Sequence, residues 1–142
     1  MFVTVWLGVL ELSSGKLIAA NGGHEYPVLK TPDGDFSLFN DFHGLVVGGM
    51  DGTKYRDYEL TLLPGAKLFV YTDGVPEATD TDGRFFGSDR LLDALNGSRD
   101  DGLAEILRDV RYSVDTFVGD AEQFDDLTML CLVYNGPLSA DT

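Results

Sequence analysis

Two apolar runs, each lying next to an aspartate, constrain most strongly what this chain can fold into. The run Lys67–Tyr71 leads into Asp73, and the run Leu127–Val133 follows Asp125. Each run has the length and composition of a buried strand. The ends of strands open into loops, where binding groups are commonly placed. If these two strand ends meet, their carboxylates form a hard, anionic oxygen cluster, which is costly unless it holds a hard cation.

Each of the two motifs also has an ordinary structural interpretation. An Asp-Gly pair such as Asp73-Gly74 is a common turn after a strand, because Asp bonds its own backbone and Gly accepts a positive φ. Asp125 and Asp126 could likewise lie in a solvated loop. The presence of both motifs in this order therefore favours a shared site more than either motif does alone.

The composition indicates a folded, acidic chain. Of the 142 residues 44% are hydrophobic, and the formal net charge is −14. Residues 67–142 carry most of this excess, with 16 acidic and 6 basic side chains. Such a charge repels nucleic acids and anionic membranes, so we expect neither as a partner. The charge is compatible with divalent cations, with a basic protein partner, or with plain solubility, which is the ordinary interpretation of Asp80, Asp82, Asp100 and Asp101.

Targeting and redox signals in the sequence favour a cytoplasmic protein. There is no apolar run of about eighteen residues, which a membrane-spanning helix would need. The first six residues lack the basic region of a signal peptide. The single cysteine, Cys131, lies in the middle of a predicted strand and is typical of a core thiol in a reducing compartment.

The first half of the chain is predicted to form strands and hairpins. Strands rich in β-branched and aromatic residues are expected over Phe2–Glu11, Lys16–Asn21, Tyr26–Lys30, Phe36–Phe39, Tyr58–Leu62 and Lys67–Thr72. Three hairpin turns are expected, at Ser13-Ser14-Gly15, at Pro32-Asp33-Gly34 and at Pro64-Gly65. The Gly-rich stretch between Asp41 and Tyr55 is predicted to be a loop.

Two helices are predicted after Asp73. The first covers Ser88–Leu95, and the second has apolar residues at helical spacing from Leu103 to Phe117. Asp100 or Asp101 is expected to cap the second helix, and Gly119 is expected to end it.

The chain is predicted to close with one more strand. The run Leu127–Tyr134 is apolar on both faces, which indicates a central position in a sheet. Residues 135–142 are expected to be a frayed tail. Strands, then helices, then a strand indicate an α+β fold in which helices pack on a mainly antiparallel sheet.

Six stretches of the chain share their order and spacing with a known family. They are Met1–Leu10, Ala20–His24, Leu63–Gly65, Tyr71–Val75, Phe86–Leu91 and Asp125–Thr128. In these stretches the chain resembles the C-terminal part of the SpoIIE-like bacterial protein serine phosphatases, which belong to the metal-dependent type-2C (PPM) superfamily. The resemblance covers nearly the whole chain and implies a β-sandwich core flanked by helices.

The resemblance implies a site and a reaction. It makes Asp73 and Asp125 metal ligands, with Asp126 as the rival to Asp125 and with Gly74, His24 and Asn21 as possible secondary residues. The implied reaction is hydrolysis of phosphoserine or phosphothreonine on a protein, by a water that two Mn²⁺ or Mg²⁺ ions activate. The implied substrate is a phosphorylated anti-sigma-factor antagonist. For His24 we favour a turn residue over a phosphate ligand, and Asn21 is expected to end its strand by bonding the turn.

One departure from the family is expected to matter. The family's metal-bridging Asp belongs to an upstream Asp-x-x-Gly-x-Gly segment, and upstream helices cover one face of the sheet. We expect the 142 residues to begin after both features, and therefore to form a partial domain with half of the two-metal site and weak or no activity.

The alternative function is a phosphatase-like module that acts by protein–protein interaction. Without a covering layer, one face of the first strand is expected to be exposed. That face would be either Val3, Val5, Leu7 and Val9 or Phe2, Thr4, Trp6 and Gly8. An exposed apolar face and an open strand edge favour self-association.

Overall fold

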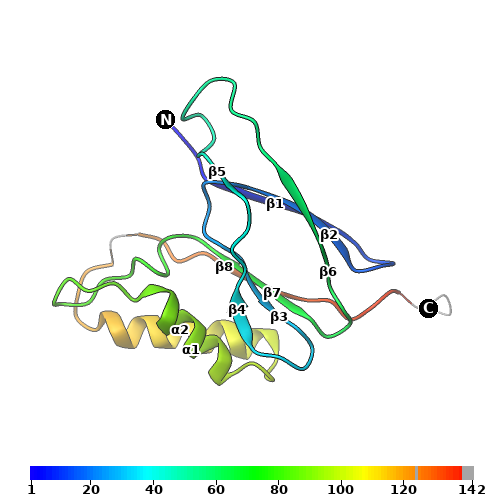
Figure 1. The fold of residues 1–142 in the computed structure, drawn as a ribbon. Coiled ribbons are helices and arrows are strands. Elements are labelled where there is room, and N and C mark those ends of the chain that lie inside the picture. The colour runs from blue at the N-terminus through cyan, green and yellow to red at the C-terminus, as the bar shows by residue number, and fades with distance from the viewer. Residues whose placement is uncertain (124, 139–142) are drawn as a thin grey trace.

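The computed structural model describes residues 1–123 and 125–138, in which eight strands and two helices form. In chain order these are β1 (Val5–Glu11), β2 (Lys16–Gly22), β3 (Val28–Lys30), β4 (Phe36–Leu38), β5 (His43–Gly44), β6 (Asp57–Thr61), β7 (Lys67–Tyr71), α1 (Gly87–Gly97), α2 (Leu103–Val118) and β8 (Met129–Val133). Figure 1 shows them in three layers: two sheets, and a layer made by both helices. The expected α+β fold with antiparallel sheets and flanking helices is confirmed.

The first sheet, here called the N-terminal sheet, consists of β1, β2, β5 and β6. The expected β1–β2 hairpin forms, with antiparallel register from Val5 opposite Gly22 to Glu11 opposite Lys16. β6 pairs antiparallel with β2. β5 lies in the stretch predicted to be a loop and pairs parallel with the last residues of β2, Asn21 and Gly22.

The second sheet, here called the helix-side sheet, has the strand order β4-β3-β7-β8 and is antiparallel throughout. Because side chains alternate along a strand, Phe69 and Tyr71 of β7 face the helices. The main core lies there, where Phe69, Leu91, Leu95, Ile106 and Val110 are all buried.

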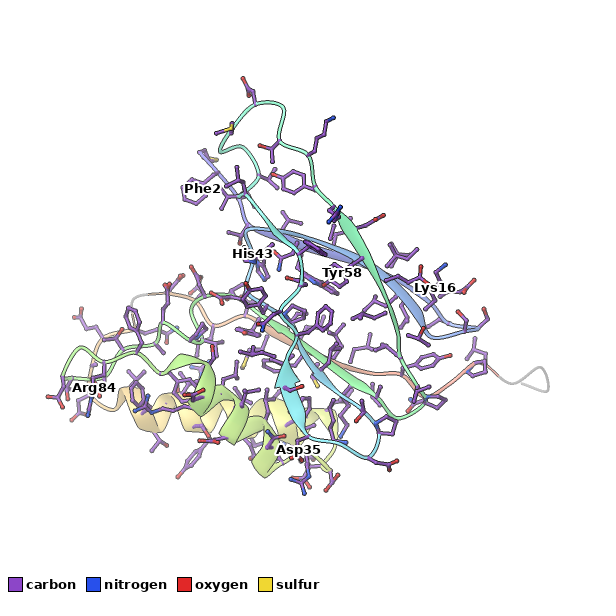
Figure 2. All side chains as sticks on the ribbon, in the orientation of Figure 1. Phe2, Lys16, Asp35, His43, Tyr58 and Arg84 are labelled. Atoms are coloured by element: carbon purple, nitrogen blue, oxygen red, sulfur yellow. The ribbon has the colours of Figure 1, made fainter. Side chains whose placement is uncertain are left out.

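The two sheets pack face to face on their other sides. Apolar side chains from both of them surround a cavity of about 110 Å³. The N-terminal sheet contributes Trp6, Gly8, Leu10 and Leu17, and the helix-side sheet contributes Leu68, Val70, Leu130 and Leu132. Phe2, at the free end of the N-terminal sheet, lies far from the helices (Figure 2) and is exposed.

The predicted hairpin between β6 and β7 is wrong. β6 pairs with β2, whereas β7 pairs with β3 and β8, so the chain changes sheets at Pro64-Gly65. The Gly65 N–H donates to the carbonyl of Tyr134 at 2.6 Å, which ties this crossing to the end of β8. The burial patterns explain the change: β6 is half polar and has one face to cover, whereas β7 is covered on both faces.

The predicted central position of β8 is also wrong. Within the described residues β8 pairs with β7 and ends the sheet. It is apolar on both faces because Met129 and Cys131 pack on the core beneath the helices, while Leu130 and Leu132 face the other sheet. Burial raises the pKa of the Cys131 thiol, as expected for a thiol in the core.

The helices form where the periodicity predicts them, with α1 slightly longer than expected. The N-cap of α2 is Gly102, so neither Asp100 nor Asp101 caps the helix. Asp101 instead donates its N–H to Ser98, and Asp100 pairs with Arg99. Gly119 ends α2 with a positive φ of 59°, as predicted.

Of the tail that we expect to fray, residues 139–142 lie outside the described residues. Asn135 to Leu138 lie in neither a helix nor a strand in the described part, and Leu138 is exposed. No helix in the described residues is both long and apolar enough to span a membrane.

Candidate metal centre

The loops beyond the paired ends of β7 and β8 leave the sheet together. The strand register ends with Tyr71 opposite Met129. Just beyond it, the Thr72 N–H donates to the carbonyl of Thr128 at 3.0 Å, and the Thr128 N–H donates to the Thr72 hydroxyl at 3.3 Å. The two motifs found in the sequence therefore start from one point of the fold.

Gly74 lies where the two motifs approach each other closely. A Cβ atom on Gly74 would lie 2.2 Å from the carbonyl oxygen of Asp126 and 3.7 Å from the Cβ of Asp125. Only a residue without a side chain permits this approach. The structure thus brings Asp73-Gly74 against Asp125-Asp126, although 52 positions separate Asp73 from Asp125 in the sequence.

The three aspartates at this point are exposed to solvent. The Asp73 carbonyl accepts the N–H of Glu77 at 2.9 Å and closes a turn, and the Asp125 carboxylate accepts the N–H of Asp126 at 2.8 Å. The motifs are thus turns as well as neighbours, so the ordinary interpretation and the site interpretation are compatible.

The carboxylate ligands at this site are of the type that a hard cation prefers, but they are too few to complete its coordination shell. In the described part of the chain, no three His, Cys, Asp or Glu side chains come close enough to hold a metal ion. Carboxylate oxygens such as those of Asp73 and Asp125 are the ligands that Mg²⁺ and Mn²⁺ prefer, and water commonly completes the shell of Mg²⁺. The residues therefore fit a weakly held, largely hydrated divalent ion.

A third carboxylate near this point, that of Glu25, is absent from the sequence prediction. β3 pairs antiparallel with β7, with Val28 opposite Phe69, so the turn that precedes β3 and the loop that follows β7 leave the sheet at the same end. Burial raises the pKa of Glu25, and the charges of Asp73 and Glu77 raise it further, while His24 and His43 act in the opposite direction. Only its position beside His24 could have drawn attention to Glu25.

Side chains of the turn that carries Glu25, and of segments beside it, hold this turn in place. The Asn21 Oδ1 accepts the N–H of His24 at 2.7 Å, so Asn21 does bond the turn at the end of β2. The His24 Nδ1 lies 3.0 Å from the Thr4 hydroxyl. The ring of His43 packs against Tyr26, with 5.1 Å between ring centroids.

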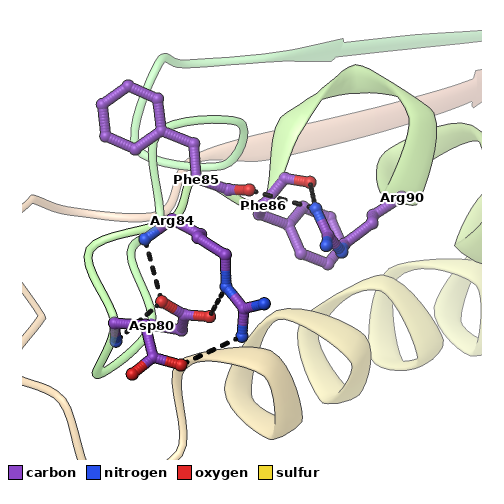
Figure 3. A network of polar contacts seen from close by, with 6 residues as sticks. Asp80, Arg84, Phe85, Phe86 and Arg90 are labelled. Atoms are coloured by element: carbon purple, nitrogen blue, oxygen red, sulfur yellow. Dashed lines mark hydrogen bonds and ion pairs between the residues drawn. The ribbon is translucent and has the colours of Figure 1, made fainter.

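The segment that follows Asp73 contains a loop that is closed by its own hydrogen bonds, although residues 81–85 are exposed. Asp80 is buried, and its carboxylate accepts the N–H groups of Asp82 and Arg84 and the Nε–H of Arg84 (Figure 3). The hydrogen bond from the Arg84 backbone is the main cause that lowers the pKa of Asp80. The solubility role expected for Asp80 is therefore wrong, because its carboxylate organises the loop.

The loop is joined to the helices by Arg90. Its guanidinium donates to the carbonyls of Phe85 and Phe86 (Figure 3) and lies 4.6 Å from the ring centroid of Phe117 in α2. A cavity of about 210 Å³ opens between the turn at residues 74–79, α2 and the segment that precedes β8. Its lining includes Gly74, Glu77, Val114, Glu122 and Asp125.

The sequence of the whole chain identifies the family. The family model described as Stage II sporulation protein E (SpoIIE) matches residues 1–135. This chain belongs to the SpoIIE family. It is also 32% identical to protein IcfG of Synechocystis sp. over 135 residues, which are 95% of this chain and 21% of IcfG. The chain therefore spans about a fifth of that relative.

Solved structures show the same fold for this SpoIIE-family chain. The SiaA PP2C domain of Pseudomonas aeruginosa matches with a TM-score of 0.73 and 23% identity, covering 85% of this chain and 47% of that one. The SpoIIE phosphatase domain of Bacillus subtilis, presoaked with Mn, matches with a TM-score of 0.72 and 14% identity, covering 96% and 58%. The RsbU and RsbW domains of a Mycobacterium tuberculosis protein match with a TM-score of 0.71 and 21% identity, covering 96% and 37%.

These likenesses confirm the predicted resemblance and the PP2C-type fold. The chain spans roughly a third to three fifths of the solved chains that it resembles.

Proposed function

We propose that this chain carries part of the active site of a metal-dependent protein serine/threonine phosphatase. The observation that supports this most is the contact of Gly74 with Asp126 at the paired ends of β7 and β8, in a chain of the SpoIIE family. Asp73 and Asp125 are the proposed metal ligands, and Asp126 is the alternative to Asp125.

Each residue at this point has a proposed task. Asp73 and Asp125 offer carboxylate oxygens from two loops that the β7–β8 pairing holds together, and Gly74 keeps those loops in contact. Glu25 and Glu77 add negative charge, which favours a divalent cation and disfavours a phosphate that arrives without one. When bound, Mn²⁺ or Mg²⁺ lowers the pKa of a water and neutralises charge on the phosphoryl oxygens. The proposed nucleophile is that water, so no side chain is assigned as one.

The proposed substrate is phosphoserine on a signalling protein of the anti-sigma-factor antagonist type. This part of the proposal is supported by the family and by the likeness to the RsbU and RsbW domains. The acidic character of the chain favours a protein substrate with basic groups near the phosphoserine.

Calorimetry with Mn²⁺ tests the proposed ligands. We expect weak binding, because two carboxylates leave most coordination positions to water. Asp73→Asn and Asp125→Asn should each remove the binding signal. Asp57→Asn, which changes an exposed carboxylate on β6, should retain it. Mn²⁺ binding that survives Asp73→Asn would place the metal elsewhere.

The alternative function is a phosphatase-like module that binds a partner without hydrolysis. Its specific support is the exposed apolar face of β1, where Leu7 and Val9 are 62% and 66% exposed. An assay on a phosphoserine peptide separates the two functions. Mn²⁺-dependent phosphate release that Asp73→Asn abolishes supports the enzyme, whereas a chain that releases none and still self-associates supports the module.

A further inference from the structure

A partly buried hydrogen-bond network joins three strands of the N-terminal sheet to one carboxylate. The Trp6 Nε1–H donates to the Tyr58 hydroxyl at 2.9 Å, and this hydroxyl donates to the Asp41 carboxylate at 2.6 Å. The Asn21 Nδ2 group donates to the same carboxylate, at 3.0 Å and 3.2 Å from its two oxygens. Asn21 and Asp41 are both buried, and Tyr58 is the member contributed by β6 (Figure 2).

The side chain of Asn21 also bonds the backbone of the turn after β2. While its Nδ2 group reaches Asp41, its Oδ1 accepts the N–H of His24 at 2.7 Å, and Nδ2 also lies 3.4 Å from the carbonyl of Glu25. Both sides of the amide are thus used to close the turn Gly22–Glu25. Any change that rotates the Asn21 amide also changes the position of that turn.

The turn lies beside the proposed metal ligand. Because β3 pairs antiparallel with β7, the turn before β3 and the loop after β7 that carries Asp73 leave the sheet at the same end, where the charges of Asp73 and Glu77 act on the Glu25 carboxylate. The network therefore ends at the loops that carry the candidate metal centre, although Trp6, Asp41 and Tyr58 themselves lie in the other sheet and its loop.

Burying the polar groups of this network costs more free energy than burying apolar side chains in their place. Burying a carboxylate costs free energy unless donors satisfy it, and none of the ion pairs in the described part of the chain includes Asp41. Two donors, the Tyr58 hydroxyl and the Asn21 amide, satisfy it instead. Apolar side chains would pack this region at less cost, so the arrangement suits a group whose orientation matters.

We propose that Trp6, Tyr58 and Asp41 are positioning residues, which act through Asn21 to hold the Gly22–Glu25 turn against the Asp73 side of the metal centre. The part of this proposal that concerns metal binding rests on the proposed function. The part that concerns the position of the Gly22–Glu25 turn is independent of it.

The test compares two tyrosine variants of the whole 142-residue chain. Tyr58→Phe removes the hydroxyl that joins Trp6 to Asp41. Tyr134→Phe is the matched control, because it removes a hydroxyl bond of 2.7 Å, to the carbonyl of Leu12, at the opposite end of the sandwich. Asp41→Asn, which keeps the shape of the side chain, is the second variant if Tyr58→Phe does not fold.

Two measurements test the proposal: amide hydrogen exchange at the turn and the affinity for Mn²⁺. Amide hydrogen exchange measures how firmly the turn is held. We expect Tyr58→Phe to speed exchange at the His24 N–H, which bonds the Asn21 Oδ1, by about tenfold or more over its effect on the core amides. Calorimetry with Mn²⁺ reports the centre, and we expect Tyr58→Phe to weaken binding by about tenfold, as outer-shell changes do. Tyr134→Phe should change neither the relative exchange at the turn nor the Mn²⁺ affinity.

The outcomes separate this proposal from the proposed function. Equal exchange effects of Tyr58→Phe and Tyr134→Phe, or unchanged Mn²⁺ affinity in Tyr58→Phe beside clear binding by the unchanged chain, would overturn the positioning role. Absence of Mn²⁺ binding by the unchanged chain would overturn the proposed function and the metal part of the positioning role, while the exchange measurement still decides whether the network holds the turn.

Discussion

The two sheets of this chain are stabilised in different ways. The helix-side sheet is covered on both faces, and Val28 and Phe69 at its centre are 0% exposed. The N-terminal sheet is covered on one face, and its outer face exposes Val5, Leu7, Val9 and Ile18 by 39% to 66%. Where the sheets meet the candidate site, the first relies on apolar packing and the second on the Asn21–Asp41–Tyr58 network.

This difference indicates that apolar packing and hydrogen bonding have different roles in the two sheets. Apolar burial supplies most of the stability and is not directional, so it serves to hold β7 and β8 together. Hydrogen bonds to buried polar groups are directional and costly to break, so they suit the turn whose position matters. The predictions that follow test this contrast, in order of the expected effect on stability.

The largest effect is expected in the core beneath the helices. Phe69→Ala should lower the free energy of unfolding by ~3–5 kcal/mol, because it removes a fully buried ring and leaves a cavity. Leu7→Ala, on the exposed face of β1, should change it by no more than ~0.5 kcal/mol. Urea unfolding of both variants measures the contrast. Similar losses would mean that the outer face of the N-terminal sheet is covered in solution.

A smaller loss is expected where the two loops touch. Gly74→Ala places a Cβ 2.2 Å from a backbone oxygen, so the loops must separate, at a cost of ~1–3 kcal/mol. Gly97→Ala, at the end of α1 and with open space around it among the described residues, should instead stabilise the chain by ~0.5–1 kcal/mol. Thermal unfolding gives both values. A neutral Gly74→Ala would show that the contact between the loops is loose.

Each sheet contains a tyrosine that makes stability depend on alkaline pH. Burial is the main cause that raises the pKa of both Tyr71 and Tyr58, and Asp41 contributes at Tyr58. In the unfolded chain a tyrosine ionises near pH ~10. The unfolded state then loses a proton that the folded state keeps, so stability is complete below that pH and falls as pH rises above it.

Urea midpoints between about pH 9 and pH 11 should show this fall. Tyr71→Phe and Tyr58→Phe should each flatten the slope above pH ~10, with the exposed Tyr112→Phe as a control. If neither variant changes the slope, the two phenols do not account for it.

The smallest effect on stability, and the largest on assembly, is expected on the outer face of β1. We expect the chain to self-associate through this face, because it presents an apolar surface and an open strand edge. Leu7→Lys and Val9→Lys should reduce the mass measured by light scattering while changing stability by no more than ~0.5 kcal/mol. Asp33→Lys, in the exposed turn between β3 and β4, is the control. A monomeric unchanged chain would contradict the prediction.

Much of the site was within reach of sequence reasoning, and part of it was not. Asp73, Gly74 and Asp125 stand in local motifs at strand ends, and the pairing of β7 with β8 brings those motifs together; their metal role stays a prediction. Asp41 and Tyr58 have no such signal. Their partners lie 17, 20 and 52 positions away in the chain, and the segment around Asp41 has the composition of a loop.

What the sequence by itself determined is local: the described strands other than β5, the two helices, two of the three hairpins and the glycine at the end of α2. These follow from alternation, helical periodicity and turn residues, which act over a few positions. Only the tertiary structure decided that β6 pairs with β2 and that β8 lies at an edge of its sheet. It also decided that the Asn21 amide donates to the Asp41 carboxylate. Strand partners and buried hydrogen bonds depend on which faces remain to be covered once distant segments meet, and no local pattern records that choice.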